Sequence, residues 1–283
     1  MAGARSATGV VAPSDVDLVP LPPTGRVVLR ERRVRLGDAS PGGRLRLDAT
    51  ARYLQDVAND DARGALEPED VNPWVVRRTA IVVHHFPVYG EELELRTWCS
   101  GTGSRWAERR TAITGDQGGH VEAAAVWVHI DLATGRAKVL SAAFAGHYVE
   151  SAQGRTVRAR LVHDDPPAGA AVTRWPVRFA DCDVLGHVNN AAYWNPVEEQ
   201  LAHHRDVRAP LRAELEYRTP VELETVGLDG SVDLRTATSA DGFAQWWCTG
   251  STVHASAVVT RRATGDGADG GDGPARRAGG AVP

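Results

Sequence analysis

Residues 175–204 read WPVRFADCDVLGHVNNAAYWNPVEEQLAHH and carry the clearest fold signal in the chain. Residues 175–179 predict a strand, and a polar loop follows them. Residues 189–204 predict a helix, because Tyr193, Val197 and Leu201 recur at helical spacing and Asn189 is a suitable N-cap. The stretch therefore predicts a strand that leads through a polar loop into one long helix.

The same order of elements occurs earlier in the chain. Residues 27–36 alternate as a strand, and residues 48–63 predict a helix with Asp48 as its N-cap. Strand-like runs follow at 75–86, 92–99, 106–114 and 122–131, and a turn then leads back into 136–140. After the second helix, similar runs occupy 211–218, 223–226, 231–238, 243–249 and 253–262. This repetition predicts an internal duplication of an α+β unit in which a sheet wraps a helix.

Breaks in composition predict how the chain divides. Residues 1–25 are expected to be a flexible tail, and the Gly- and Asp-rich residues 264–283 a disordered one. Pro166-Pro167 and Gly169 predict a linker over 151–171. The linker separates a first unit, residues 26–150, from a second unit, residues 172–263. We expect the units to pair like a homodimer within one chain, and a further homodimer of chains is possible.

Composition excludes several classes of protein. The 283 residues are 42% hydrophobic and 24% charged, without an apolar run of membrane-spanning length or a signal peptide. These features predict a cytoplasmic protein without a membrane partner. An isoelectric point near 6.2 disfavours a nucleic-acid partner. Three cysteines are too few for a disulfide framework or a structural zinc site.

Chemistry-bearing side chains concentrate between residues 178 and 193. Asp183 and His187 lie four positions apart, with Gly186 between them. A helix capped by Asn189 would leave the N–H groups of residues 190–192 free at its positive end. Such amides can hold the developing oxyanion of an acyl group while the carboxylate attacks or activates water. The pattern therefore favours acyl hydrolysis.

The motif F-A-D-C-D-x-x-G-H-V-N-N-x-x-Y, residues 179–193, closely resembles the active-site segment of hotdog-fold thioesterases. The two-unit layout resembles the double-hotdog acyl-ACP thioesterases of plants and bacteria, and residues 96–98 and 215–218 look like strands of that family. The resemblance implies a tandem hotdog fold of class α+β, with two antiparallel sheets each wrapped around a long helix. It implies hydrolysis of fatty acyl-ACP or acyl-CoA thioesters to free acid and carrier thiol in fatty acid biosynthesis. It requires neither a bound cofactor nor a metal.

Carried over by position, the resemblance implies site residues. The expected catalytic residues are Asp183, His187 and Asn190, and the expected substrate-binding residues are Gly186, Asn189, Tyr193 and Trp194. The plant enzymes typically carry an asparagine where this chain has Leu185, and an acidic residue and a cysteine where it has Pro220-Val221. Glu222 lies one residue further on. The first unit has only Asp38 in its corresponding connection, so we expect it to be catalytically silent and to supply the acyl pocket.

Structural roles for the same residues stay open. Asp183 could be a turn residue, His187 could order the loop, and Asn189 and Asn190 could be caps or braces. Two other functions also stay open: an enoyl-thioester hydratase or dehydratase, and a non-catalytic acyl-thioester binding or sensing protein. The hydratase is disfavoured because its motif typically spaces Asp and His five apart, with an Asn-Pro between them.

Histidine and cysteine residues suggest little beyond this site. His84-His85 and His203-His204 invite a metal interpretation, but adjacent strand residues point to opposite faces and no third ligand is suitably spaced. Cys182 lies between two aspartates, which should raise its thiol pKa and leave it inert. Arginine clusters at 30–35, 105–110 and 155–160 could dock an acidic carrier protein, although such clusters are most often solvated.

Overall fold

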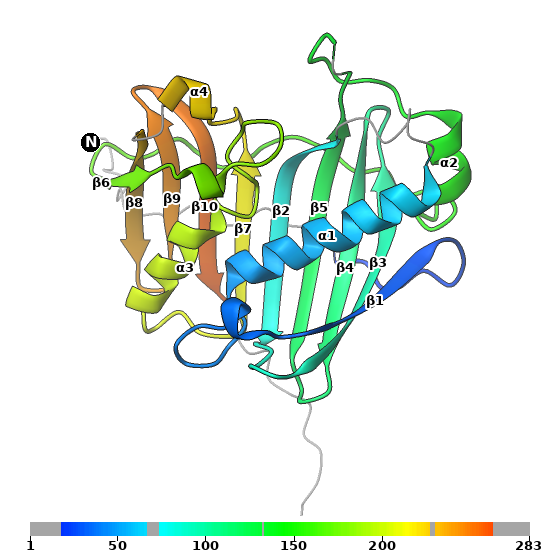
Figure 1. Ribbon diagram of the computed structural model, residues 1–283, viewed down its shortest axis with the longest axis horizontal. Helices are drawn as coiled ribbons and strands as arrows, with labels where there is room; N and C mark the ends of the chain where they lie inside the picture. The colour runs from blue at the N-terminus through cyan, green and yellow to red at the C-terminus, as the bar shows by residue number, and fades with distance from the viewer. Residues whose placement is uncertain (1–17, 67–73, 132, 227–229, 263–283) are drawn as a thin grey trace, which may run out of the picture.

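A computed structural model describes residues 18–66, 74–131, 133–226 and 230–262. Its ten strands form one antiparallel sheet in the order β1-β3-β4-β5-β2-β7-β10-β9-β8-β6 (Figure 1). The first half contributes β1 (Val27–Arg33), β2 (Trp74–His85), β3 (Glu92–Thr102), β4 (Trp106–Gly115) and β5 (His120–His129). The second half contributes β6 (Ala171–Pro176), β7 (Leu211–Tyr217), β8 (Ser231–Ser239), β9 (Gly242–Thr249) and β10 (Thr252–Arg261).

The two halves repeat one topology. In each half the strands lie in the relative order first, third, fourth, fifth, second, so the halves meet where β2 pairs with β7. The helices α1 (Leu47–Ala65) and α3 (Trp194–His203) cover the same face of this sheet (Figure 1). A single cluster of buried side chains spans both halves beneath them. The predicted α+β tandem hotdog fold is confirmed, but the expectation of two separate sheets is wrong, because the pairing of β2 with β7 joins the two five-stranded halves into one sheet.

The helix α1 starts one residue earlier than predicted, and its cap differs. Arg46 is the N-cap and makes no side-chain capping bond, so the prediction that Asp48 caps the helix is wrong. The Asp48 carboxylate instead accepts hydrogen bonds from Arg46 and Arg52, at 2.8 and 2.7 Å. Tyr53, Leu54 and Val57 form the buried face, as their spacing requires. The first turn of α1 is thus held by ion pairs rather than by a cap.

The helix α3 begins at Trp194, five residues later than predicted. Pro196 has no N–H and cannot donate to the carbonyl of residue 192, so it fits only in the first turn of an α-helix. Residues 190–193 form tight turns instead, in which Ala192 N donates to Asn189 O at 2.9 Å and Trp194 N to Ala191 O at 3.1 Å. The prediction that Asn189 caps this helix is therefore wrong.

Two short helices were missed. Residues 136–140 make only an isolated bridge, Ile130 to Ala137, and α2 (Ala142–Tyr148) follows them. Ser141 caps α2 by accepting a hydrogen bond from Phe144 N at 3.1 Å. Residues 223–226, predicted as a strand, form α4 (Leu223–Val226), because the amides of Thr225 and Val226 donate to the backbone carbonyl of Glu222.

The far face of the sheet is covered by segments expected to be loose. The side chain of Arg110, fully buried, donates to Val19 O, so part of the predicted N-terminal tail packs on β4. Within the predicted linker, the amides of Val162 and His163 donate to the Glu216 carboxylate at 2.6 and 3.0 Å. Val19, Val162 and His163 therefore pack on the sheet, whereas residues 1–17 and 264–283 fall outside the described residues. Of the helices that the structure describes, none is both long and apolar enough to cross a membrane.

Candidate active site

The loop between β6 and α3 is closed by its own backbone. Phe179–Asp181 form a short 3-10 helix, after which Asp183 N donates to His187 O at 2.9 Å and Gly186 N donates to Asp183 O at 3.0 Å. Gly186 has φ 75°, a conformation that glycine adopts without the penalty of a side chain. The Asp183 carboxylate accepts from Leu185 N at 2.9 Å, and the residue is only half-buried. The loop thus holds the Asp183 carboxylate in a defined turn, and its second oxygen has no hydrogen-bond donor among the described residues.

His187 faces a carboxylate whose role the sequence left open. Its backbone forms an isolated antiparallel bridge with Glu222, next to a hydrogen bond from Val188 N to Val221 O at 2.9 Å. The His187 Nε2 atom lies 3.9 Å from Glu222 Oε1. Both side chains are exposed by a third or more, so this is a loose ion pair. The fold nevertheless brings Glu222 beside His187, although Glu222 lies just after the positions where the plant enzymes carry an acidic residue and a cysteine.

Two of the three amides expected to be free are already bonded. The Asn189 side chain accepts from Ala191 N at 2.9 Å, and its carbonyl accepts from Ala192 N. The described residues offer no acceptor to the Asn190 N–H. Of the three amides that were expected to be free, the Asn190 N–H is thus the one without an acceptor among the described residues.

Asn190 and Ala191 line a narrow pocket that runs beneath α1 into the first half. Its other walls come from α1, β2, β4 and β5, together with Trp194 and Tyr217 from the second half. Of the predicted substrate-binding residues, Trp194 lines this pocket, whereas Tyr193 packs among Trp175, Tyr217 and Trp247. Gly186 and Asn189 shape the loop, and neither they nor Asp183 and His187 line the pocket.

A buried hydrogen-bond chain holds Asn190 against this pocket. The Trp194 indole Nε1 donates to the Tyr217 hydroxyl at 3.1 Å, and that hydroxyl donates to Asn190 O at 3.0 Å. Burial raises the pKa of Tyr217 well above its usual value, so the hydroxyl keeps its proton and remains a donor. Nothing in the linear sequence relates Tyr217 to Asn190, and sequence analysis missed this role.

The first half contains the same loop with different side chains. Ser40 N donates to Arg44 O and Gly43 N donates to Ser40 O, each at 2.8 Å, which matches the bonds of Asp183, Gly186 and His187. The bridge Ala39–Leu45 corresponds to Cys182–Val188. Ser40 thus stands where the second loop has Asp183, and Arg44 where it has His187. The first loop has neither a carboxylate nor an imidazole at these positions.

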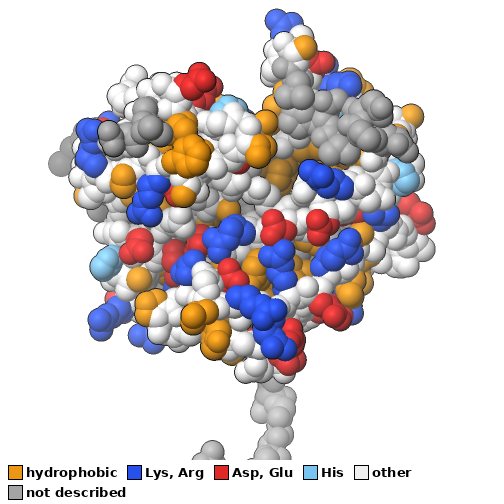
Figure 2. All heavy atoms as spheres, in the orientation of Figure 1, with side chains coloured by type: hydrophobic (Ala, Val, Ile, Leu, Met, Phe, Trp, Pro, Cys, Tyr) orange, Lys and Arg blue, Asp and Glu red, His pale blue; other side chains and the backbone are white. Residues whose placement is uncertain are grey.

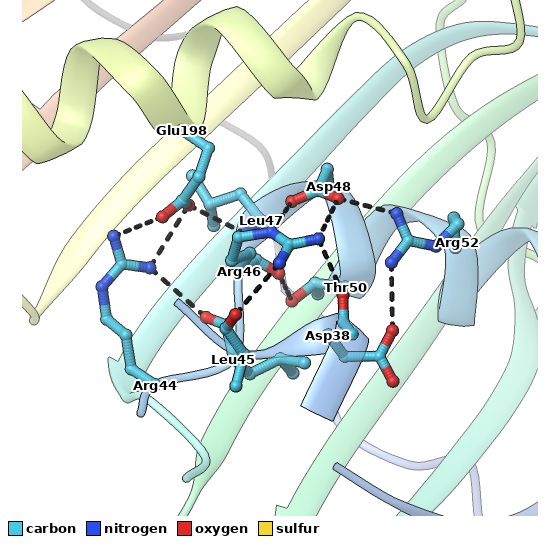
Figure 3. A network of polar contacts seen from close by, with 11 residues as sticks. Asp38, Arg44, Leu45, Arg46, Leu47, Asp48, Thr50, Arg52 and Glu198 are labelled. Atoms are coloured by element: carbon cyan, nitrogen blue, oxygen red, sulfur yellow. Dashed lines mark hydrogen bonds and ion pairs between the residues drawn. The ribbon is translucent and has the colours of Figure 1, made fainter. Parts of the chain in front are cut away.

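A carboxylate already binds the backbone amide at the N-terminus of α1. The Glu198 carboxylate of α3 accepts from Leu47 N at 3.1 Å and pairs with the Arg44 guanidinium at 2.6 Å (Figure 3). A substrate carbonyl cannot bind an amide that a buried carboxylate covers. This geometry favours a single site, located in the second half.

Arginines near the first loop are largely paired. Lys and Arg side chains alternate with Asp and Glu over α1 and its neighbours (Figure 2). Arg32 pairs with Asp56 at 2.8 Å, and Arg52 with Asp38 at 3.0 Å. Asp38 also accepts from the Tyr53 hydroxyl at 2.7 Å. Within the 30–35 cluster, Arg30 and Arg33 likewise form ion pairs, with Asp60 and Glu92.

Cys182 agrees with its expected inertness, whereas the histidine prediction needs a correction. Burial, with Asp181 and Asp183 nearby, raises the pKa of the Cys182 thiol. Ligand atoms of His84, His120 and Glu122 lie within 4.8 Å of one another, so the expectation that no third ligand is near His84 is wrong. The fold pairs β2 with β5 and gathers these residues, although Glu122 already binds the buried Arg110 at 2.8 Å.

Comparisons with known proteins agree with this architecture. A family model described as the acyl-ACP thioesterase N-terminal domain matches residues 25–147, and one described as the C-terminal domain matches residues 165–239. The uncharacterized protein Rv2001 of Mycobacterium tuberculosis is 30% identical over 208 residues, 74% of this chain and 83% of that protein. The chloroplastic palmitoyl-acyl carrier protein thioesterase of Arabidopsis thaliana is 29% identical over 128 residues, 42% of this chain and 31% of that protein.

Solved structures share the fold at low identity. The 12:0-ACP thioesterase from Umbellularia californica has a TM-score of 0.67 and 19% identity, covering 83% of this chain and 97% of that one. An acyl-ACP thioesterase from Bacteroides thetaiotaomicron has a TM-score of 0.63 at 19% identity, with the same coverage. Fold and family models together define a thioester hydrolase with a tandem hotdog fold. The chain belongs to the acyl-ACP thioesterase family.

Proposed function

We propose that this protein hydrolyses fatty acyl thioesters, with acyl-ACP as the carrier-bound substrate and acyl-CoA as the alternative, in cytoplasmic fatty acid biosynthesis. One observation carries the proposal. Asn190 and Ala191 line the pocket beneath α1, and the loop that leads directly into these residues carries Asp183 and His187. An acyl chain in the pocket would thus place its thioester carbonyl beside the reactive loop.

The proposed chemistry uses three groups of the second half. The Asn190 N–H donates to the carbonyl oxygen and stabilises the negative charge that develops on it. The Asp183 carboxylate attacks the carbonyl carbon or removes a proton from the attacking water. His187, with Glu222 beside it, protonates the departing thiolate sulfur. If Asp183 attacks directly, water then hydrolyses the acyl–Asp183 anhydride and regenerates the carboxylate; in either route the products are a free fatty acid and the carrier thiol.

The first half contributes binding rather than chemistry. Its α1 and its strands form most of the pocket wall, while Ser40 and Arg44 replace the reactive side chains of the second loop. Glu198 covers the amide of Leu47. We therefore propose one site per chain.

Thiol release tests the proposal. A chain-length panel of acyl-ACP and acyl-CoA thioesters is assayed with wild type, Asp183→Asn and Asp181→Asn. Asp181 is the matched control, because its carboxylate accepts from Arg178 N and closes the 3-10 helix. We expect Asp183→Asn to lower kcat by about a hundredfold or more, and Asp181→Asn to retain most of it. Equal activity in the two variants would remove Asp183 from the mechanism, and absence of thiol release across the panel would refute the function.

A further inference from the structure

The pocket beneath α1 contains polar atoms that a plain hydrocarbon channel would not need. Gln55 of α1 and Trp127 of β5 both line it. The Gln55 Oε1 atom and the Trp127 Nε1 atom are each buried, and neither has a hydrogen-bond partner among the described residues. Buried polar atoms in folded proteins are nearly always paired, so two unpaired atoms in one pocket indicate a missing partner.

Three other polar side chains of this pocket are already engaged in hydrogen bonds or ion pairs. Arg109 forms an ion pair with the buried Asp61 at 2.7 Å. The Thr111 hydroxyl donates to Thr97 Oγ1 at 3.1 Å. Tyr217 is held between Trp194 and Asn190. Among the described first-half residues that line the pocket, Gln55 and Trp127 are therefore the ones with unpaired buried side-chain atoms.

The chemistry of the two atoms defines the missing group. An indole N–H only donates, and an amide oxygen only accepts. A saturated acyl chain would leave both unpaired and would seal them from water. A hydroxyl group both accepts and donates, so it can pair with the indole N–H and with the amide oxygen. A keto oxygen could pair only with the indole.

We propose that the acyl group bound in this pocket carries a hydroxyl group along its chain, recognised by Trp127 and Gln55. The inference rests on the proposed function, because it takes this pocket as the acyl site. Asn190 lines the same cavity, so one ligand can reach the loop amide and these side chains.

The test compares a saturated acyl-CoA with hydroxyacyl-CoA thioesters of equal length, with the hydroxyl moved along the chain, and with the matching ketoacyl-CoA. For wild type, we expect one hydroxylated isomer to exceed the saturated substrate in kcat/KM by about tenfold or more. Trp127→Phe removes the N–H and keeps an aromatic ring, and should reduce this ratio to near one. Trp246→Phe is the control, since its indole donates to Asp164 O outside the pocket, and should leave the ratio unchanged.

Calorimetric binding of the free acids separates this inference from the proposed function, because it needs no turnover. Tighter binding of the hydroxy acid, lost in Trp127→Phe, would support the inference even if no thioester were hydrolysed. Thiol release without any preference for a hydroxylated chain, or a preference that survives Trp127→Phe, would overturn the inference and leave the function standing. Preference for the keto chain over the hydroxylated one would also overturn it.

Discussion

The Glu198 carboxylate of α3 accepts a hydrogen bond from the backbone N–H of Leu47, the first residue of α1, at 3.1 Å. The two residues lie in different halves of the chain. Arg44 holds the other carboxylate oxygen at 2.6 Å, so one side chain closes a helix end and ties the halves together. Figure 3 shows the Glu198 carboxylate between Arg44 and the backbone of Leu47.

Removing this carboxylate should destabilise the protein. In Glu198→Ala, the Leu47 N–H and the partly buried Arg44 lose their acceptor, and we expect the free energy of unfolding to fall by about 2 kcal/mol or more. Urea denaturation measures the change. Glu199→Ala, on the exposed side of the same helix, should change it by less than about 0.5 kcal/mol. Equal effects would show that the Glu198 contacts add no stability.

Asp48 should make stability depend on acid pH. Burial alone would raise its pKa, but hydrogen bonds from Arg46 and Arg52 outweigh burial and lower it. The unfolded carboxyl, with a pKa of about 3.9, then binds protons more readily than the folded one. Its stabilisation is complete above that value and is lost as the pH falls through the lower folded pKa.

Unfolding free energies measured from pH 6 downward test this linkage. The slope below about pH 5 should be shallower in Asp48→Asn than in wild type. Asp56→Asn is the control, because Asp56 is half exposed and pairs only with Arg32. A slope unchanged in Asp48→Asn would contradict the prediction.

Glu222 should assist His187 only weakly. The pair is 3.9 Å apart and both members are exposed, so the ion pair contributes little to orienting the imidazole. Glu222→Gln should lower kcat/KM for thiol release by less than tenfold, far below the loss in Asp183→Asn. If the two losses were similar, Glu222 would be a direct participant in the reaction.

The Tyr217 hydroxyl should matter for both stability and activity. Tyr217→Phe leaves the Trp194 indole N–H buried without an acceptor and releases the Asn190 carbonyl. We expect a loss of about 1–3 kcal/mol in unfolding free energy and a lower kcat, because the Asn190 amide is held less firmly. Tyr89→Phe, at an exposed position, should change neither quantity. Retention of full activity in a destabilised Tyr217→Phe would restrict the hydroxyl to a structural role.

The repeated order of strand, helix and strands predicted the tandem fold, because side-chain periodicity is a local property. The same local patterns failed at helix starts. Pro196 delays α3, and Asp48 is drawn to Arg46 and Arg52 instead of capping. Periodicity predicts which face of a helix or strand is buried. It does not predict which of several polar groups will hydrogen-bond a given side chain at the end of that element.

The motif around Asp183 predicted the loop that forms the candidate site, whereas the surrounding contacts depend on pairing between distant strands. Tyr217 reaches Asn190 from β7, and Glu222 reaches His187 across an isolated bridge. Gln55 and Trp127 meet the same pocket from the first half. Their sequence neighbours give no signal of these roles, since each becomes meaningful only when the sheet brings it into place.

The covalent joining of the halves has one further consequence. In an assembly of two identical chains, a side chain that hydrogen-bonds the free amide at one helix N-terminus would do so at both, because symmetry repeats every contact. A single chain escapes that constraint: Glu198 accepts the Leu47 amide at the start of α1, whereas the Asn190 N–H in the turns before α3 has no acceptor among the described residues. Because the halves are fused, equivalent positions can carry different side chains, which twofold symmetry forbids. The loop of the first half therefore stabilises the contact between the halves, while the loop of the second half carries the proposed reactive groups.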